Sequence, residues 1–258
     1  MKTNNNTGCI FCRETDGNFT AREHTIPESM GNTEDVLPVG DVCDHCNNVV
    51  LSQIDSALCE FFPITMRRMM LGTPSKAGKI PVLRASKGTI TFIPGLNGED
   101  PTLAIKANSP KQPMVRPKPA TEGKVTLNMN MGGGKPVKAA YASQLSRAIL
   151  KIGYEVAWLK YGEMMLEPRF DHVREVILGA PRDGFFYMAH KMDPTESNFA
   201  VVYDFVQLDN GDWRMWVILR YAGIELGTDS RLVKPALEVD LPLDVFCFTV
   251  PKKKTPGT

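Results

Sequence analysis

Four of the six cysteines stand in two closely spaced pairs near the start of the chain. Cys9 and Cys12 form one Cys-x-x-Cys pair, and Cys43 and Cys46 form a second one 31 residues further along. Each pair can present two thiolates from a tight turn, and four thiolates are a donor set that tetrahedral Zn²⁺ prefers. Because four thiolates leave no open position for water, the spacing predicts a structural zinc that stabilises a segment too small to hold its own core.

A glutamate and a histidine stand side by side between the two cysteine pairs. Glu23 and His24 are followed by Thr-Ile-Pro-Glu-Ser-Met-Gly, and the second cysteine pair is followed directly by Asn47 and Asn48. The stretch CIFC…EHTIPESMG…VCDHCNN…ID resembles the HNH endonucleases, which are zinc-containing ββα-metal nucleases, and specifically the subfamily that ends in Cys-x-x-Cys-Asn. The resemblance covers residues 9–60 and includes both cysteine pairs, the Glu-His pair and the trailing asparagine, in that order.

The resemblance implies a catalytic role for three residues. His24 would be the general base, and Glu23 and Asn47 would be ligands of a catalytic divalent cation, with Asn48 as a substitute for Asn47. These residue types suit phosphodiester hydrolysis, because a neutral histidine can take a proton from water near pH 7. A hard cation such as Mg²⁺ or Mn²⁺, held by oxygen ligands, stabilises the charge that develops on the phosphate.

The sequence departs from the family pattern at two positions. The last position of the motif is often histidine and is Asn47 here, and the asparagine that orients the base in many relatives has no clear counterpart just before Cys43. Asn32 is the nearest candidate for that role. A treble-clef-like zinc module that binds nucleic acid or a protein partner without catalysis therefore remains an alternative to the enzyme. The Glu23–His24 pair favours the enzyme, because a binding module does not need a base beside an acid.

The remaining histidines and cysteines carry weaker signals. His45 lies inside the second cysteine pair, and we expect it to be exposed or to contact a phosphate. We expect His172 and His190 to be structural, since neither has a partner at ligand spacing. Two cysteines lie among apolar residues and are predicted to be core thiols, namely Cys59 and Cys247.

The net charge of +1 hides a division along the chain. Residues 1–62 carry three basic and ten acidic residues, residues 63–140 carry thirteen basic and three acidic ones, and residues 141–251 carry eleven and sixteen. A local basic surface is enough to engage phosphates, so we expect residues 63–140 to contact DNA. The alternatives are that this stretch is a solvated connector, or that the Lys252–Lys254 tail holds the DNA. The candidate DNA contacts are Arg67, Arg68, Lys76, Lys79, Arg84 and Lys87.

Periodicity predicts an α+β fold. Apolar positions between Asp44 and Phe62 recur at helical spacing, and Pro63 is expected to mark the end of that helix. Short alternating runs within residues 79–128 indicate antiparallel strands. Two helices at 137–162 and 170–178 are followed by alternating runs, and Asn210–Gly211 marks a hairpin. The later runs are GFFYMAH, FAVVYDFVQL, WRMWVILRYAG and DVFCFTV.

Length and composition divide the chain into three predicted parts. These are a zinc-stabilised ββα-metal (treble-clef-like) HNH module at 1–63, a basic β-rich region and linker at 64–136, and an α+β accessory domain at 137–258. The composition, 43% hydrophobic and 23% charged, is that of a globular protein. Without an apolar stretch of about 20 residues or a secretory leader, we expect a cytoplasmic protein with no membrane partner. The accessory domain would serve homodimerisation, substrate reading or regulation by a ligand or partner, and family association suggests phage defence or restriction.

Overall fold

The N-terminal part of the chain is built from turns followed by two consecutive helices. The computed structural model describes residues 8–85, 88–93, 102–107, 139–180, 185–190, 199–207, 209, 213–230 and 244–247. A single turn of 3₁₀-helix covers Glu28–Met30, and a π-helical turn at Cys46–Leu51 leads into α1 (Ser52–Glu60) and then α2 (Phe62–Leu71).

The predicted helix after the second cysteine pair is confirmed, but its end differs from the expectation. The helix stops at Glu60, and Pro63 lies in the first turn of α2. A proline costs nothing there, because the first N–H groups of a helix have no intrahelical acceptor. Helix α2, which the sequence analysis did not predict, ends at Gly72 with a left-handed φ of 66°.

A three-stranded antiparallel sheet follows α2, as the alternating runs predicted. Its order is β1-β2-β3, and Ile90 pairs with Ile105 across the two longer strands. A further alternating run of the predicted 79–128 region, KVTLNMN after Gly123, lies outside the described residues. The strands are β1 (Leu83–Ala85), β2 (Gly88–Ile93) and β3 (Thr102–Ala107).

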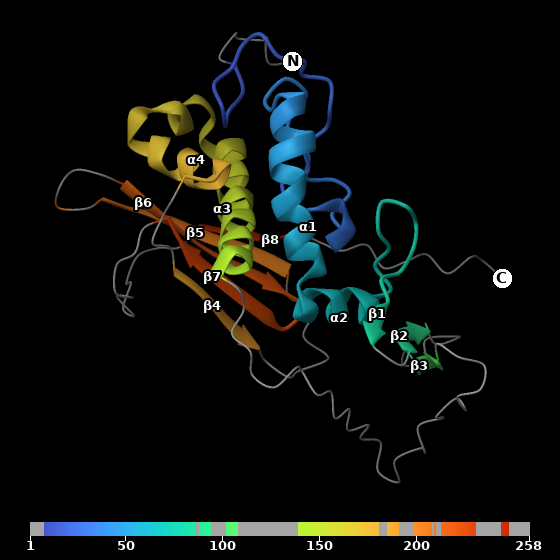
Figure 1. Ribbon diagram of the computed structural model, residues 1–258. Coiled ribbons are helices and arrows are strands. Elements are labelled where there is room, and N and C mark those ends of the chain that lie inside the picture. Colours follow the sequence, from blue (N-terminus) through green and yellow to red (C-terminus); the bar gives the residue numbers. More distant parts are fainter. Residues whose placement is uncertain are drawn as a thin grey trace.

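A long helix and a five-stranded antiparallel sheet form the C-terminal part. Figure 1 shows α3 (Ala139–Tyr161) lying across this sheet, with α1 alongside it and α4 (Asp171–Leu178) near its end. Two short 3₁₀ turns, Gly162–Leu166 and Pro168–Phe170, connect α3 to α4. The sheet order is β4 (Phe185–His190), β7 (Ile224–Asp229), β6 (Trp213–Tyr221), β5 (Phe199–Gln207) and β8 (Asp244–Cys247).

The hairpins of this sheet confirm one prediction and add one strand. Strands β5 and β6 pair from Phe199–Tyr221 to Gln207–Trp213, so the Asn210–Gly211 pair, which lies outside the described residues, falls in their connection. Strand β7 was not predicted. It follows β6 through a two-residue turn in which Ala222 and Gly223 have φ values of 46° and 81°, a conformation that suits tight hairpins.

One hydrophobic core joins the two ends of the chain. The same buried cluster contains Cys9 and Ile54 from the N-terminal part and Ile149 and Leu219 from the C-terminal part. The rings of Phe11 and Tyr154 lie 5.6 Å apart at this contact. The division into three domains stays a prediction, but residues 9–64 do not have a core separate from α3.

No single helix among the described residues is long and apolar enough to cross a bilayer. The segments Cys46–Glu60 and Phe62–Leu71 pass this test only as a pair, and that pair is bent by 73°.

Candidate functional site

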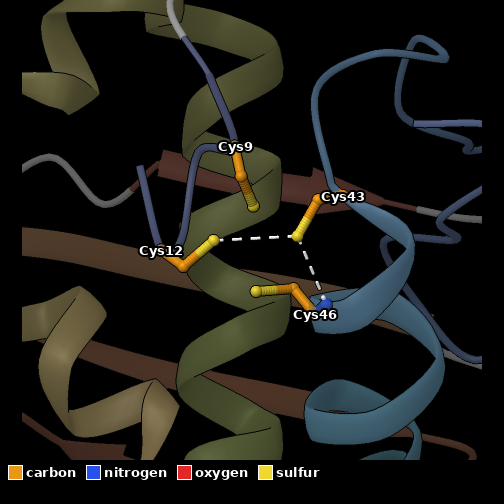
Figure 2. Close-up of side chains that lie close together, drawn as sticks. All are labelled: Cys9, Cys12, Cys43 and Cys46. Atoms are coloured by element: carbon orange, nitrogen blue, oxygen red, sulfur yellow. Dashed lines mark hydrogen bonds between the residues drawn. The ribbon is translucent and has the colours of Figure 1, made fainter. Parts of the chain in front are cut away.

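The four cysteines of the two pairs come together as predicted. Figure 2 shows Cys9 and Cys12 on one turn and Cys43 and Cys46 at the start of the facing helix, with all four thiols pointing inward. Their sulfur atoms lie within 4.8 Å of one another, and Cys12 Sγ and Cys43 Sγ are 3.7 Å apart. A tetrahedral zinc with Zn–S bonds of about 2.3 Å separates its sulfurs by about 3.8 Å, so the cluster fits Zn²⁺.

The local backbone sets this geometry. The Cys9 carbonyl accepts a hydrogen bond from Arg13 N at 2.9 Å, which closes the first turn, and Arg13 itself has a φ of 69°. In the second turn the Cys46 N–H donates to Cys43 Sγ at 3.4 Å. A hydrogen bond with Cys46 lowers the pKa of the Cys9 thiol and raises that of Cys46, while burial raises the pKa of Cys12. Without a cation, one thiolate in the cluster is therefore stabilised by its neighbouring thiols.

The Glu23–His24 pair lies on one arm of a short hairpin. His24 pairs with Val36 in an antiparallel bridge, and the Leu37 N–H donates to the Glu23 carbonyl at 2.8 Å. Asn32, the candidate for orienting the base, is 1% exposed. Its amide donates to Ile26 O at 3.1 Å and Asp35 O at 3.0 Å, so it fixes the hairpin loop that follows His24.

The predicted catalytic residues line one cavity. Its volume is about 240 Å³, and Glu23, His24 and Asn47 all border it. Asn47 reaches it from the first turn of the helix after Cys46. Three buried polar atoms at this cavity have no hydrogen-bond partner, namely His24 Nδ1, Asn47 Nδ2 and Asp55 Oδ1. The carboxylate oxygen and the imidazole nitrogen suit a hydrated cation and a reacting water, whereas the Asn47 Nδ2 can only donate a hydrogen bond, so Asn47 would hold a cation through its Oδ1.

The surroundings of His24 lower the pKa of its imidazole and so favour its neutral form. Burial lowers its pKa, and the positive charges of Lys76, Lys151 and Arg22 lower it further, whereas Glu28 opposes the shift. A histidine whose pKa lies below its ordinary value is unprotonated at neutral pH and can accept a proton.

The Glu23 carboxylate is held by a lysine from the C-terminal part of the chain. Lys151 on α3 is fully buried, and its Nζ lies 2.5 Å from Glu23 Oε1 and 3.0 Å from Asp55 Oδ2. Burial alone would lower the pKa of Lys151, but Asp55, Glu155 and Glu23 outweigh it and hold this pKa well above its usual value. The lysine is therefore a permanent cation beside the predicted metal ligand.

The predicted DNA contacts divide into exposed and buried residues. Lys76 and Lys79 are exposed, and Lys76 borders the cavity. Arg67 and Arg68 are 6% and 5% exposed. Arg68 donates to Cys59 O at 3.1 Å, and Arg67 Nη1 lies 3.9 Å from Met70 Sδ, so both arginines are buried against this chain rather than displayed on its surface. The side chains of Arg84 and Lys87 lie outside the described residues.

The secondary candidates are placed as follows. His45 is exposed, and Cys59 is a buried core thiol, as expected. His172 Nε2 lies 2.9 Å from Ser230 O, which agrees with a structural role. The side chains of His190 and Cys247 lie outside the described residues.

Three residues at the site were given no role by the sequence analysis, namely Arg22, Asp55 and Lys151, although Asp55 is the last residue of the stretch that carries the resemblance. Arg22 is exposed and borders the cavity together with Asp55. The available signal for Lys151 was its i,i+4 pair with Glu155 inside the apolar run from Ala148 to Trp158. A charge pair in such a run points to a buried polar contact rather than to a solvated helix face.

Comparison with known proteins confirms the predicted resemblance for the N-terminal part. Residues 9–63 match the family model described as HNH endonuclease, which is less than half of the chain. The matched segment contains both cysteine pairs, the Glu23–His24 pair and Asn47. No curated protein and no solved structure gives a significant match.

Proposed function

We propose that the protein is a metal-dependent DNA endonuclease in which His24 is the general base. The observation that carries the proposal is the cavity where the His24 imidazole, with its lowered pKa, meets the oxygen-bearing side chains of Glu23 and Asn47. The family match over residues 9–63 supports phosphodiester hydrolysis and a DNA substrate.

The chain's own residues supply proton transfer and phosphate binding. Neutral His24 accepts the proton of the attacking water, while exposed Arg22 and Lys76 at the cavity bind the backbone phosphates. Glu23 and Asn47 would hold a divalent cation, with Asp55 beside them. Such a cation, Mg²⁺ or Mn²⁺, neutralises charge on the scissile phosphate and on the leaving oxygen when it is bound. The four-cysteine zinc would hold the hairpin and the start of the helix in fixed positions relative to each other.

A role in phage defence or restriction is part of the proposal.

Plasmid cleavage tests this function. The purified protein should nick or linearise plasmid DNA with Mg²⁺ or Mn²⁺, and His24→Ala should lower the cleavage rate at saturating DNA by about 100-fold or more. Its DNA affinity should stay within about twofold, because a neutral base adds little to ground-state binding. The matched control is His45→Ala, which removes an exposed histidine that does not border the cavity. Its cleavage rate at saturating DNA should be normal, because a phosphate contact would change the affinity and not kcat. Binding without any cleavage by the unaltered protein would instead support the non-catalytic zinc module.

A further inference from the structure

We propose that Lys151, which lies outside the family-matched segment, is a positioning residue of the candidate active site. Its ammonium group fixes the carboxylate of Glu23 and the backbone of His24 from helix α3. The inference rests on the proposed function. It means that the C-terminal part of the chain helps to place the catalytic groups.

The contacts of Lys151 Nζ converge on the elements that border the cavity. Besides its ion pair with Glu23 at 2.5 Å, it donates to the backbone carbonyl of His24 at 3.1 Å. It also donates to Asp55 Oδ2 on α1 at 3.0 Å. One ammonium group therefore ties the Glu-His pair to the helix that follows the second cysteine pair, and its three donors match these three acceptors.

The burial of this cluster makes its geometry rigid. Lys151 and Glu155 are 0% exposed and Glu23 is 5% exposed. A buried charge is tolerated only where it is paired and hydrogen-bonded, which holds for Lys151 with Glu23 and Asp55, whereas both oxygens of Glu155 lack a hydrogen-bond partner. Alternative positions of the Lys151 and Glu23 side chains are therefore strongly disfavoured. A carboxylate held in this way offers its remaining lone pairs to the cavity in one orientation.

The docking of the C-terminal part, helix α3 and strand β6, does not depend on Lys151 alone. Trp158 Nε1 donates to Asp41 Oδ2 at 2.6 Å, and Tyr221 Oη donates to Met30 O at 3.2 Å. The Phe11–Tyr154 ring contact adds an apolar anchor. Because these contacts also hold the two parts together, the fold should survive the loss of Lys151, but with lower stability, since Glu23 and Asp55 then lack their buried counter-ion.

The decisive comparison is between Glu155→Met and the double variant Lys151→Met/Glu155→Met. The double variant replaces the helix pair by apolar side chains of similar volume, which folded proteins often tolerate. The two proteins differ only in Lys151. Two quantities are measured on zinc-loaded, folded protein, namely kcat for plasmid cleavage at saturating Mn²⁺ and the Kd of Mn²⁺ from the electron paramagnetic resonance signal of the free ion.

The cleavage rate and the affinity for Mn²⁺ should move in opposite directions: kcat falls while Mn²⁺ binds more tightly. Without Lys151 the Glu23 carboxylate loses its fixed position, so kcat should fall by about tenfold or more. The Kd of Mn²⁺ should fall by about threefold or more, because a competing positive charge has been removed. A residue that serves stability alone would leave both quantities unchanged in the folded protein.

Each other outcome decides against the inference. An unchanged kcat, or an unchanged Kd of Mn²⁺, would overturn the positioning role. If the unaltered protein does not cleave DNA, the proposed function fails separately, and the Kd of Mn²⁺ alone decides whether Lys151 acts on the cation site. If the double variant does not fold, Lys151→Arg replaces it. This variant keeps a buried cation but places its donors differently, so a loss of kcat supports the inference and full kcat overturns it.

Discussion

The indole Nε1 of Trp158 donates a hydrogen bond of 2.6 Å to Asp41 Oδ2, across 117 residues of sequence. The backbone carbonyl of the same aspartate accepts a hydrogen bond from the Ile10 N–H at 2.9 Å, directly after Cys9. Asp41 itself precedes Cys43 by two residues. One residue thus connects both cysteine pairs with the end of α3. The predicted zinc site and the C-terminal helix should therefore gain or lose stability together.

Removal of one zinc ligand should change the surroundings of Trp158 and therefore its fluorescence. We expect about one zinc per chain, and Cys43→Ser should abolish zinc retention and unfold the N-terminal module, since a structural zinc supplies much of the folding free energy of such a module. The fluorescence of the tryptophans should change with the same midpoint as zinc release during a chelator titration. Metal analysis and fluorescence measure these effects.

The control for this experiment is Cys59→Ser. Cys59 is buried but lies outside the four-cysteine cluster, so its variant should retain zinc. A folded Cys43→Ser protein without zinc would contradict the assignment.

The packing of α3 on the sheet makes a second prediction. A Cβ at Gly153 would lie 2.4 Å from Val217 Cγ2 on β6. Alanine normally favours a helix over glycine by about 1 kcal/mol. Here Gly153→Ala should still lower the free energy of unfolding by about 1–3 kcal/mol, because the added methyl group overpacks the contact. Urea denaturation measures the change. Ser143→Ala, at an exposed position of the same helix, should be neutral within about 0.5 kcal/mol.

The sequence predicted the parts of the site that depend on local spacing. Two Cys-x-x-Cys pairs indicate a four-thiol cluster wherever their turns meet, so the cluster needs no knowledge of the rest of the fold. The Glu23–His24 pair and Asn47 were likewise found by motif and lie around one cavity. The position of Lys151 could not be predicted in this way, because it depends on how α3 packs against a hairpin 127 residues earlier in the chain.

The prediction of the fold was limited in the same way, to elements with a clear local pattern. Periodicity found α3, α4 and the β5–β6 hairpin, since each repeats an apolar pattern over several residues. It missed α2, because Pro63 suggested a stop and the helical run contains two buried arginines. Those arginines were expected on the surface because they are charged. The sequence does not show which carbonyl groups inside the core need hydrogen-bond donors, so their burial could not be predicted.

The pH dependence of kcat should follow the His24 imidazole. Its pKa is lowered, mainly by burial. The neutral form is the base, so kcat should rise with pH through a pKa below the ordinary value of about 6.5 and then level off. Lys76→Gln removes a positive charge that disfavours the imidazolium, which should move this rise to higher pH. Glu28→Gln removes a negative charge that favours the imidazolium, which should move the rise to lower pH.

Profiles measured at saturating DNA separate this effect from binding. Both shifts should shrink at high salt, because the charges act through partly exposed space. Shifts in the same direction for Lys76→Gln and Glu28→Gln would contradict His24 as the titrating base.

The salt dependence of DNA binding locates the phosphate contacts. Each phosphate neutralised on duplex DNA contributes about −0.9 to the slope of log affinity against log salt. Lys76 and Lys79 are exposed in the segment after α2, and Arg22 borders the same cavity as Lys76. Replacing Lys76 or Arg22 by Gln should therefore weaken binding at low salt and make the slope shallower by about one unit for each residue.

Fluorescence anisotropy with the His24→Ala protein measures the slope without cleavage. Arg68→Gln is the matched control: its guanidinium is buried against Cys59 O, so this variant should lower stability and leave the slope unchanged. Deletion of Lys252, Lys253 and Lys254 tests the competing location at the end of the chain. If that deletion makes the slope shallower while the Lys76 and Arg22 variants have the same slope as the unaltered protein, the DNA does not pass over the cavity. Because His24 lies at the cavity, DNA bound elsewhere would be out of its reach, and this result would contradict the proposed hydrolytic mechanism.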